Sequence, residues 1–420
     1  MKLEAIMFFF AKKISPKLGI IVPAGLKKRI KDRIIKKSIL RYINKDKISY
    51  KKGIYKGGVN LIGGIKAEMG LGQSCRLIAY MLKEAKFSLS IYNYDFAGAV
   101  SERDSSFDEY IMDDLPHEIN IFHVNPYELG ELFMKRRDAW NGRYNIAFWL
   151  WELEEFPKEW KVYCQLFDEI WTPSEFASRA MAKVTDVPIR VLPYAILAQY
   201  DKNIRRKDFF LPEDKFLFLV MYDANSTEGR KNPQGAIKAY KKAFASQNQD
   251  VGLVIKVNNA NDSQLKALKL QLEEYRNIYY MTETLDKRTV NSLIKRVDVY
   301  VSLHRAEGFG LVMAEAMLLE TPVIATNWSA NIEFMDEDSA CMVDYKLVEN
   351  PKTEGLYKKD CIWAEPNYNQ ASAYMKRLWE DKEYYLSKKG NGKAYIENKL
   401  NEERLVNLLK KYIDNIMYIK

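Results

Sequence analysis

The feature that most constrains the fold is an alternation of short apolar runs with helix-length amphipathic segments, which occurs twice along the 420-residue chain. The runs are apolar at nearly every position, as in strands that are covered on both faces. Such an alternation predicts parallel sheets covered by helices. The expected strands are 59–65, 88–94, 119–125, 144–151, 169–174 and 189–195 in the first set, and 216–222, 252–257, 278–283, 297–303 and 322–327 in the second.

The two sets of runs predict an α/β protein with two domains. Helix-length segments lie between the runs, among them 72–85, 232–246, 263–276 and 287–296, and a charged stretch, 199–215, separates the sets. We expect two Rossmann-like domains, 57–198 and 199–395, with parallel sheets facing across a cleft, and an amphipathic helix, 396–420, that returns to the first domain. Because open α/β sheets bind ligands at the carboxyl ends of their strands, the expected site lies in that cleft.

The basic charge of the chain is confined to an N-terminal extension, residues 1–56. This extension has 17 Lys and Arg against three acids, a net charge of +14, whereas the whole chain carries +9. Apolar positions recur at three- and four-residue steps opposite a basic face, which predicts an amphipathic helix. Its apolar positions are Leu26, Ile30, Ile34, Ile35, Ile39, Tyr42 and Ile43.

Two interpretations of this helix stay open. It packs on its own domain, or it docks on an anionic membrane surface with the run "IMFFF" (6–10) inserted beside it. Nucleic acid is not an expected partner, because the charge comes without the motifs of RNA-binding modules. The apolar runs are too short for a membrane span or a signal peptide, and the four cysteines are too dispersed for a disulfide framework. We therefore expect a cytoplasmic protein, peripheral on the inner face of the cell membrane if the extension docks.

The stretch "HRAEGFGLVMAEAM" (304–317) follows an expected strand and has the layout of an anion site. Gly308 and Gly310 allow close approach of the backbone, and the helix expected from Leu311 presents free amide groups to a phosphate. Glu307 and Glu315 would lie roughly 12 Å apart along a helix, wider than the roughly 5–9.5 Å between paired glycosidase carboxylates. The two acids are therefore expected to hold opposite ends of one ligand, a layout that suits a sugar nucleotide.

The whole segment "HRAEGFGLVMAEAMLLETPVIATNWSANIEF" (304–334) resembles the E-x7-E signature of retaining glycosyltransferases with the GT-B fold, specifically glycosyltransferase family four. The similarity extends over residues 57–390 and leaves out the basic extension. Further segments that resemble the family are "GGIKAEMGLGQSCR" (63–76), "WELEEFPKEW" (151–160), "DEIWTPSEFASRAM" (168–181), "EGRKNPQGAIKAY" (228–240) and "WAEPNYNQASAYM" (363–375).

The resemblance implies a role at the donor for each matching residue. Glu307 would lie by the transferred sugar, and Glu315 would hold the ribose hydroxyls. Arg230 and Lys231 would offset the charge of the leaving diphosphate, which grows in the transition state. The loop and helix start would offer amide groups to the sugar and the diphosphate; these residues are Gly308, Phe309, Gly310 and Leu311.

One departure from the family pattern concerns charge. Many relatives have a further Arg where this chain has Asn225. We expect Lys256 or Arg305 to supply the missing charge. His304, directly beside the loop, is a further candidate for donor binding.

Fewer residues stand out on the other side of the cleft. Gly70 and Gly72 in "EMGLGQS" precede a helix and suit a loop that cradles a phosphate of donor or acceptor. His123 lies near the end of an expected strand, where the family often has a histidine near the reacting sugar, so it is a candidate catalytic residue. A lone histidine at a strand end is equally compatible with a structural role.

Neither a metal ion nor another cofactor is expected, because Arg230, Lys231 and a helix N-terminus already supply positive charge. The stretch "DED" (336–338) formally fits a DxD metal motif. Its place before "ACMVDY" indicates a surface turn instead.

The leading hypothesis is a retaining glycosyltransferase that moves a hexose from a nucleoside diphosphate sugar, with GDP-mannose as a first guess, to a hydroxyl of a glycan. The basic extension favours a lipid-linked oligosaccharide acceptor, as in bacterial surface polysaccharide or lipopolysaccharide synthesis. One alternative is a nicotinamide-dependent oxidoreductase, for which "GGIKAEMGLGQSC" fits the dinucleotide motif poorly. The other is a catalytically silent, membrane-bound sugar-nucleotide-binding protein, which is expected to lose the charged residues that this chain keeps.

Overall fold

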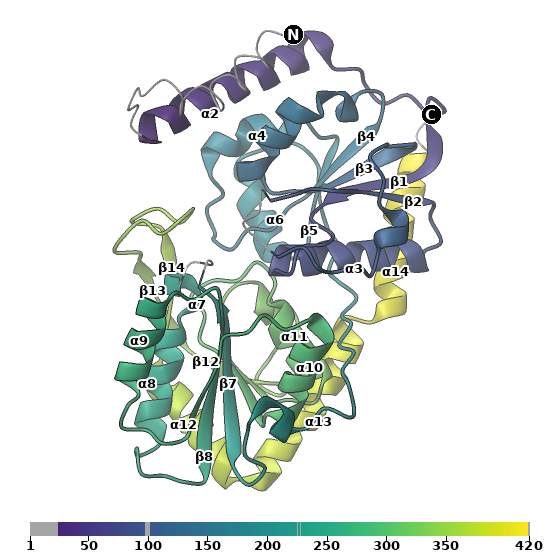
Figure 1. Cartoon of the computed structure of the whole chain (residues 1–420). Coiled ribbons are helices and arrows are strands. Elements are labelled where there is room, and N and C mark those ends of the chain that lie inside the picture. Colours follow the sequence, from purple (N-terminus) through teal and green to yellow (C-terminus); the bar gives the residue numbers. More distant parts are fainter. Residues whose placement is uncertain (1–23, 97–100, 225, 227, 419–420) are drawn as a thin grey trace.

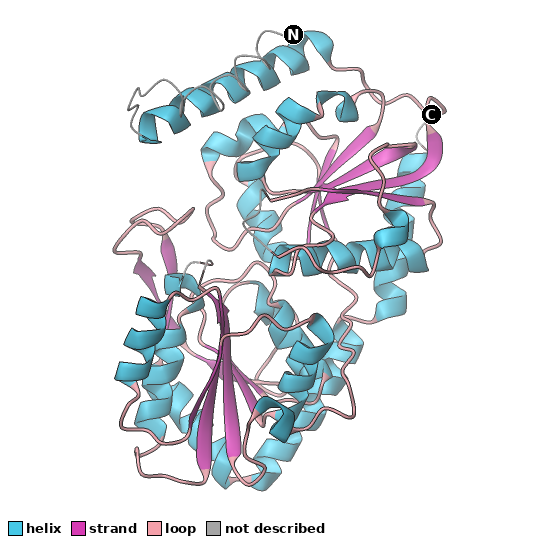
Figure 2. Cartoon of the chain, in the orientation of Figure 1, coloured by secondary structure: helices cyan, strands magenta, loops and turns pink. Residues whose placement is uncertain are grey.

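The computed structural model describes residues 24–96, 101–224, 226 and 228–418. The chain forms two α/β units, one above the other in Figure 1, and each has a six-stranded sheet with helices on both faces. Figure 2 distinguishes the two sheets from the helices that cover them. The alternation of apolar runs and amphipathic segments thus forms the layers that the sequence predicts.

The first sheet has the strand order β2-β1-β3-β4-β5-β6, and all its neighbouring strands are parallel. Leu61 of β1 pairs with Ile91 of β2 and with Ile121 of β3, and all three side chains are fully buried. The strands are β1 (Lys56–Gly63), β2 (Leu89–Asn93), β3 (His117–His123), β4 (Tyr144–Phe148), β5 (Glu169–Thr172) and β6 (Ile189–Val191).

The second sheet has the strand order β12-β11-β10-β7-β8-β9 and is also parallel throughout. Its carboxyl ends face those of the first sheet, because the loops that follow β10 contact the loops that follow β4 and β5. The strands are β7 (Phe216–Asp223), β8 (Val251–Asn258), β9 (Ile278–Met281), β10 (Val299–Ser302), β11 (Val323–Thr326) and β12 (Cys341–Val343).

Each amphipathic segment contains a helix, but α8 and α9 are each four residues shorter than the segments that predict them, and the segment 396–420 contains the end of α13 as well as α14. In the first unit they are α2 (Ala24–Arg41), α3 (Gly70–Glu84), α4 (Pro126–Lys135), α5 (Lys161–Cys164) and α6 (Glu175–Ala182), with short turns η1 (Tyr42–Asp46), η2 (Asp108–Tyr110), η3 (Arg137–Trp140) and η4 (Lys158–Trp160). In the second they are α7 (Glu228–Lys231), α8 (Pro233–Ala243), α9 (Asp262–Gln271), α10 (Lys287–Arg296), α11 (Leu311–Leu318), α12 (Tyr368–Glu380) and α13 (Lys382–Lys399), with turns η5 (Arg206–Phe209) and η6 (Ala330–Glu333). The last helix, α14 (Glu402–Met417), crosses to the first unit, where Tyr412 Oη donates to Val191 O at 3.2 Å.

The eleven expected strands are all present, but the edge strand β12 and an antiparallel hairpin were not expected. The hairpin consists of β13 (Tyr345–Glu349) and β14 (Ile362–Pro366) and rises from the second unit toward the first. Strand β13 has only five residues, three of them exposed, and Lys346 and Glu349 interrupt its apolar positions, so it lacks the continuous apolar runs of the two large sheets. So short and exposed a segment has no period that distinguishes a strand from a loop.

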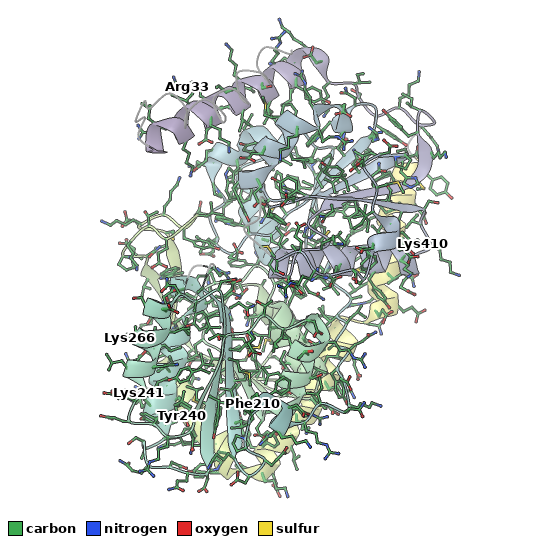
Figure 3. The ribbon with its side chains drawn as sticks, viewed as in Figure 1. Arg33, Phe210, Tyr240, Lys241, Lys266 and Lys410 are labelled. Carbon is green, nitrogen blue, oxygen red and sulfur yellow. The ribbon has the colours of Figure 1, made fainter. Side chains whose placement is uncertain are left out.

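The basic helix α2 packs on its own domain along only part of its length. Its C-terminal half packs on the first unit, where Ile35 and Ile39 are buried and Ile35 lies against Gly130 of α4. Its N-terminal half projects beyond α4, and Leu26 and Ile30 are each 49% exposed. Arg33 lies on the outward side of the same helix (Figure 3). The run "IMFFF" lies outside the described residues, and none of the described helices has the length and apolar character that a membrane span needs.

Candidate functional site

The glycine-rich loop lies at the carboxyl end of β10. Strand β10 ends at Ser302 and α11 begins at Leu311, so the loop comprises residues 303–310. Gly310 has a φ of +103°, in the left-handed region that favours glycine. Among the described residues no side chain caps α11, so its first amide groups remain able to bind an anion.

Glu307 lies in this loop and forms a buried charge cluster with two cations of α7. Only 7% of Glu307 is exposed, its Oε1 accepts a hydrogen bond from Lys231 Nζ, and the same oxygen lies 3.3 Å from Nη1 of Arg230. Burial would raise the pKa of Glu307, but Lys231 and Arg230 together outweigh burial and lower the pKa to about 2. The structure thus brings three predicted donor-site residues together, with the carboxylate ionised at neutral pH.

Hydrogen bonds from behind the loop hold Glu307 in this position. Ser329 Oγ accepts from the Glu307 amide at 2.9 Å, and Thr326 Oγ1 donates to the His304 carbonyl at 2.6 Å. The His304 ring is fully buried, with Nε2 3.0 Å from Asn331 Oδ1. His304, a predicted donor-binding residue, has no accessible surface and supports the loop from behind.

The second glutamate of the signature is paired with a cation that the sequence does not single out. Glu315 on α11 is 1% exposed, and its Oε2 lies 2.5 Å from Lys287 Nζ at the start of α10. Burial raises the pKa of Glu315, and Lys287 opposes this shift. The other oxygen, Oε1, has no hydrogen-bond partner among the described residues. A buried acceptor without a donor is rare in native proteins and fits a position that a ligand hydroxyl would fill.

The two residues expected to replace the missing Arg, Arg305 and Lys256, both have partners other than Glu307. Arg305 is occupied elsewhere, since its Nε lies 2.5 Å from Glu365 Oε2 and its Nη1 donates to Gly229 O. Lys256, at the end of β8, is 2% exposed and donates to Asn258 Oδ1, and burial lowers its pKa to about 8. Asn225 itself lies outside the described residues.

In the first unit the two predicted glycines differ in what surrounds them. A Cβ at Gly72 would lie 2.0 Å from the Ala67 carbonyl oxygen, so the close approach of that loop requires glycine. Gly70 has open space around it and is exposed. Gly70 is therefore the member of the pair whose backbone is accessible to a ligand.

His123, the predicted catalytic histidine, lies in the core of the first unit. None of its surface is exposed, its Nε2 is 2.6 Å from Ser74 Oγ on α3, and its ring stacks on Phe148 at 5.1 Å. Burial lowers its pKa to about 4, so the ring is neutral at physiological pH. His123 therefore contacts helix α3, and its side chain is not exposed in the cleft.

The loop of Glu307 is also held by the first unit, through residues that the sequence does not single out. Ser174 Oγ donates to Gly308 O at 2.8 Å, and a Cβ at Gly308 would lie 3.0 Å from Trp151 O. The Phe309 ring is 4% exposed and packs edge-on against Tyr194 at 4.9 Å. Phe309 is thus an apolar contact between the two units. The segments with Trp151 and Ser174 were recognised by resemblance, but single residues in them carried no distinguishing signal.

The "DED" stretch forms a turn. The Asp336 carboxylate accepts from the amides of Asp338 and Ser339 at 3.1 and 2.9 Å. Within the described parts of the chain, no group of three or more His, Cys, Asp and Glu side chains is placed to hold a metal ion.

Comparisons with known proteins agree with this arrangement. The family described as "Glycosyl transferases group 1" matches residues 201–349, and a search of curated protein sequences gave no match. Among solved structures, sucrose-phosphate synthase from Thermosynechococcus elongatus has a TM-score of 0.63 at 13% identity, covering 86% of this chain and 99% of its own. A glycosyltransferase from Rickettsia africae has a TM-score of 0.63 at 12% identity, covering 87% and 100%. Anabaena HepE, solved with UDP and glucose, has a TM-score of 0.58 at 12% identity, covering 85% and 100%.

The two parallel six-stranded sheets therefore have the GT-B architecture. The family match in the second unit supports glycosyltransferase activity.

Proposed function

We propose that this protein transfers a hexose from a nucleoside diphosphate sugar to a hydroxyl of a glycan acceptor, with retention of the anomeric configuration. The observation that carries the proposal is the buried cluster of Glu307 with Arg230 and Lys231 beside the start of α11. The site combines two cations with the start of α11, which no described side chain caps, at the carboxyl end of β10, as binding of a diphosphate requires.

Without donor, Glu307 pairs with both cations and offsets one of their two positive charges. A diphosphate brings more negative charge than one carboxylate, so it draws Lys231 and Arg230 toward its oxygens and leaves Glu307 to accept hydrogen bonds from the sugar. The cations stabilise the leaving group most strongly as its charge grows in the transition state. At the other end, the free Oε1 of Glu315 accepts a ribose hydroxyl.

The chemical step needs no protein nucleophile. The acceptor oxygen attacks the anomeric carbon on the face from which the diphosphate departs, and the bond between that carbon and the diphosphate oxygen breaks. The bonding electrons go to the diphosphate, which takes the proton of the acceptor hydroxyl. The role we propose for His123 is indirect, through Ser74 and the α3 loop, because its ring is buried.

Metal-independent transfer follows from the charges at the site. Arg230, Lys231 and the α11 amides together offset the diphosphate, so activity is expected to persist in EDTA. An activity that EDTA abolishes and Mg²⁺ or Mn²⁺ restores would contradict this part of the proposal.

The experiment that tests the transfer is a panel of UDP- and GDP-sugars, including GDP-mannose, with thermal shift and product formation as readouts. A donor that binds across the site raises the melting midpoint. Glu307→Gln and Lys231→Met are each expected to lower kcat roughly 100-fold or more, the cost of losing one preorganised charge at a transition state. Lys266→Met, an exposed lysine on α9 (Figure 3), is the matched control and is expected to keep wild-type kcat. Undiminished transfer in Glu307→Gln would refute the assignment.

We further propose that the N-terminal half of α2 docks on an anionic membrane and brings the site to a lipid-linked oligosaccharide in surface polysaccharide or lipopolysaccharide synthesis. Leu26 and Ile30 are half exposed among basic residues, as membrane insertion of one helix side requires. Leu26→Asp with Ile30→Asp is expected to reduce binding to vesicles that contain anionic lipid, with Tm unchanged. Binding equal to that of the wild type would contradict the docking.

A further inference from the structure

The unexpected hairpin ends in a tight turn, Glu354–Tyr357, that reaches both units. The backbone amides of Glu354 and Tyr357 each donate to the other residue's carbonyl, at 2.8 and 2.9 Å, and Gly355 between them has a φ of +58°. These two reciprocal hydrogen bonds pair the residues directly across the turn, as in an antiparallel bridge. The side chains of both residues contact α7, and Tyr357 also reaches the first unit.

Glu354, the first residue of the turn, holds the short helix α7, which carries Arg230 and Lys231. The Gly229 amide donates to Glu354 Oε2 at 3.1 Å. The hairpin makes a second connection to the same helix through Arg305, which is paired with Glu365 of β14 and whose amide donates to Arg230 O at 2.8 Å. The position of α7 therefore depends on the position of the hairpin.

Tyr357, the last residue of the turn, contacts the first unit. Tyr357 is 6% exposed, and its Oη donates to Glu152 Oε2 at 3.0 Å, in the loop after β4. Its ring lies 6.0 Å from that of Trp151. The exposed pair Lys358–Glu159, at 2.7 Å, adds a second contact between the same segments.

Arg230 lies against the ring of Tyr357. The guanidinium carbon is 5.8 Å from the ring centroid, and the guanidinium Nε has no hydrogen-bond partner among the described residues. Besides its pair with Glu307, Arg230 donates to Ala306 O at 2.9 Å and to Ser226 Oγ at 3.4 Å. The Tyr357 ring therefore lies against one side of a guanidinium whose Nε is not held by a hydrogen bond from the described residues.

We propose that Tyr357 is a positioning residue, which holds Arg230 in line for the donor diphosphate only while its hydroxyl is bonded to Glu152 of the opposite unit. The orientation of the Arg230 guanidinium would then depend on the Tyr357–Glu152 contact between the two units. This inference rests on the proposed function for its kinetic consequence, but the mechanical coupling across the cleft stands apart from it.

The proposal predicts that loss of the Tyr357–Glu152 contact lowers kcat much more than it changes KM for the donor. Lys231 and the α11 amides still bind the diphosphate when Arg230 is displaced, so KM for the donor changes by less than about threefold. Arg230 acts most as charge grows on the leaving group, so kcat falls by about tenfold, the scale of a lost hydrogen bond to a charged group. A variant that merely loosened the fold would change Tm and both kinetic parameters together.

The test compares Tyr357→Phe, Glu152→Ala and their combination with the wild-type full chain. Tyr357→Phe keeps the ring against Arg230 and Trp151 and removes only the hydroxyl. Hydrogen–deuterium exchange without ligand reports on the amides of Gly229 to Lys231, and kinetics with the donor from the panel report kcat and KM. Lys358→Met, which breaks the exposed pair in the same loop, is the matched control, and Glu152→Gln keeps an acceptor oxygen for Tyr357.

We expect each single variant to speed exchange at α7 at least about fivefold and to lower kcat about tenfold, with no further loss in the combination. Lys358→Met is expected to change neither exchange at α7 nor kcat. Glu152→Gln is expected to keep exchange and kcat close to the wild-type values, unlike Glu152→Ala. Unchanged exchange at α7 in Glu152→Ala would overturn the coupling, whatever the activity. Faster exchange with wild-type kcat would overturn the positioning of Arg230. If the wild-type protein used no sugar nucleotide, the proposed function would fail, and exchange alone would still decide the coupling.

Discussion

Lys287→Met is a direct test of how the second glutamate of the signature is held. Glu315 is 1% exposed and has one cation in contact, Lys287 Nζ at 2.5 Å. Methionine keeps most of the apolar stem of the lysine and removes the charge. The variant therefore leaves a buried carboxylate without its cation, while the packing around the stem stays similar.

The magnitude follows from the burial of the pair. Removing one partner of a buried ion pair costs about 3–5 kcal/mol, because the remaining charge is neither solvated nor paired. The Lys287 side chain is 27% exposed, so water reaches that end of the pair, and the lower end of this range, about 3 kcal/mol, is expected. For a domain of this size, 1 kcal/mol shifts Tm by roughly 2–4 °C, so the expected loss is about 6–12 °C.

The loss depends on pH in a defined direction. Burial raises the pKa of Glu315 above its usual 4.5, and removal of Lys287 raises the pKa further. The folded chain then keeps a proton that the unfolded chain releases above pH 4.5, so the free energy of unfolding falls as the pH rises. The Tm deficit of Lys287→Met is expected to be small near pH 5 and full at pH 8.

The assay is scanning calorimetry of wild type and variants at both pH values. Lys358→Met, whose pair is exposed at both ends, controls for loss of a lysine as such and is expected to shift Tm by less than about 2 °C. Lys287→Met combined with Glu315→Gln is expected to recover most of the stability at pH 8. A Tm of Lys287→Met within 2 °C of the wild type at pH 8, or a deficit larger at pH 5 than at pH 8, would refute the reasoning.

Three further predictions concern the first unit. Gly72→Ala is expected to lower Tm by several degrees, because its Cβ would lie 2.0 Å from Ala67 O. Gly70→Ala, whose Cβ would have no atom within 4 Å, is expected to leave Tm unchanged in the same calorimetric scan. Equal shifts in the two variants would contradict this. Burial raises the pKa of Glu128 to about 7, so ionisation of this carboxyl at higher pH destabilises the folded state. Glu128→Gln is therefore expected to raise Tm at pH 8 but not at pH 5. A rise in Tm of the same size at both pH values would be the contrary result. Ile39 is fully buried on the inner side of α2, so Ile39→Ala is expected to lower the free energy of unfolding in urea by about 2–4 kcal/mol. Ile30 on the same helix is half exposed, and Ile30→Ala is expected to lower it by less than about 0.5 kcal/mol. Similar losses in the two variants would mean that the helix is not packed as described.

Much of the fold could be predicted from the sequence, because it depends on local periodicity. Strands covered on both faces are continuous apolar runs, and each of the eleven expected runs forms a strand. The loop of Glu307 could be located for the same reason, since its strand, glycines and helix are consecutive. The hairpin β13–β14 was not expected, because it is short and most of β13 is exposed, so it has no apolar period to detect.

The positions of single side chains could not be predicted in the same way. The sequence singles out His123 by its place near the end of a strand, but the packing of α3 and Phe148 around it buries the ring. Helix α2 is amphipathic along its length, yet only the half that reaches α4 and α5 is packed. In both cases burial depends on which other elements lie above the residue.

What the sequence by itself determined is the order along the chain of the strands and helices of the two large sheets, and the position of the Glu307 loop between β10 and α11, since neighbours in the chain specify both. Only the tertiary structure decided which polar side chains are paired. Glu307 forms ion pairs with Arg230 and Lys231, Glu315 forms one with Lys287, and Tyr357 donates a hydrogen bond to Glu152. Glu307 and Arg230 are 77 residues apart, and Tyr357 and Glu152 are 205 apart in the chain. Pairs so distant leave no local pattern, because their contact results from the folding of whole sheets against one another.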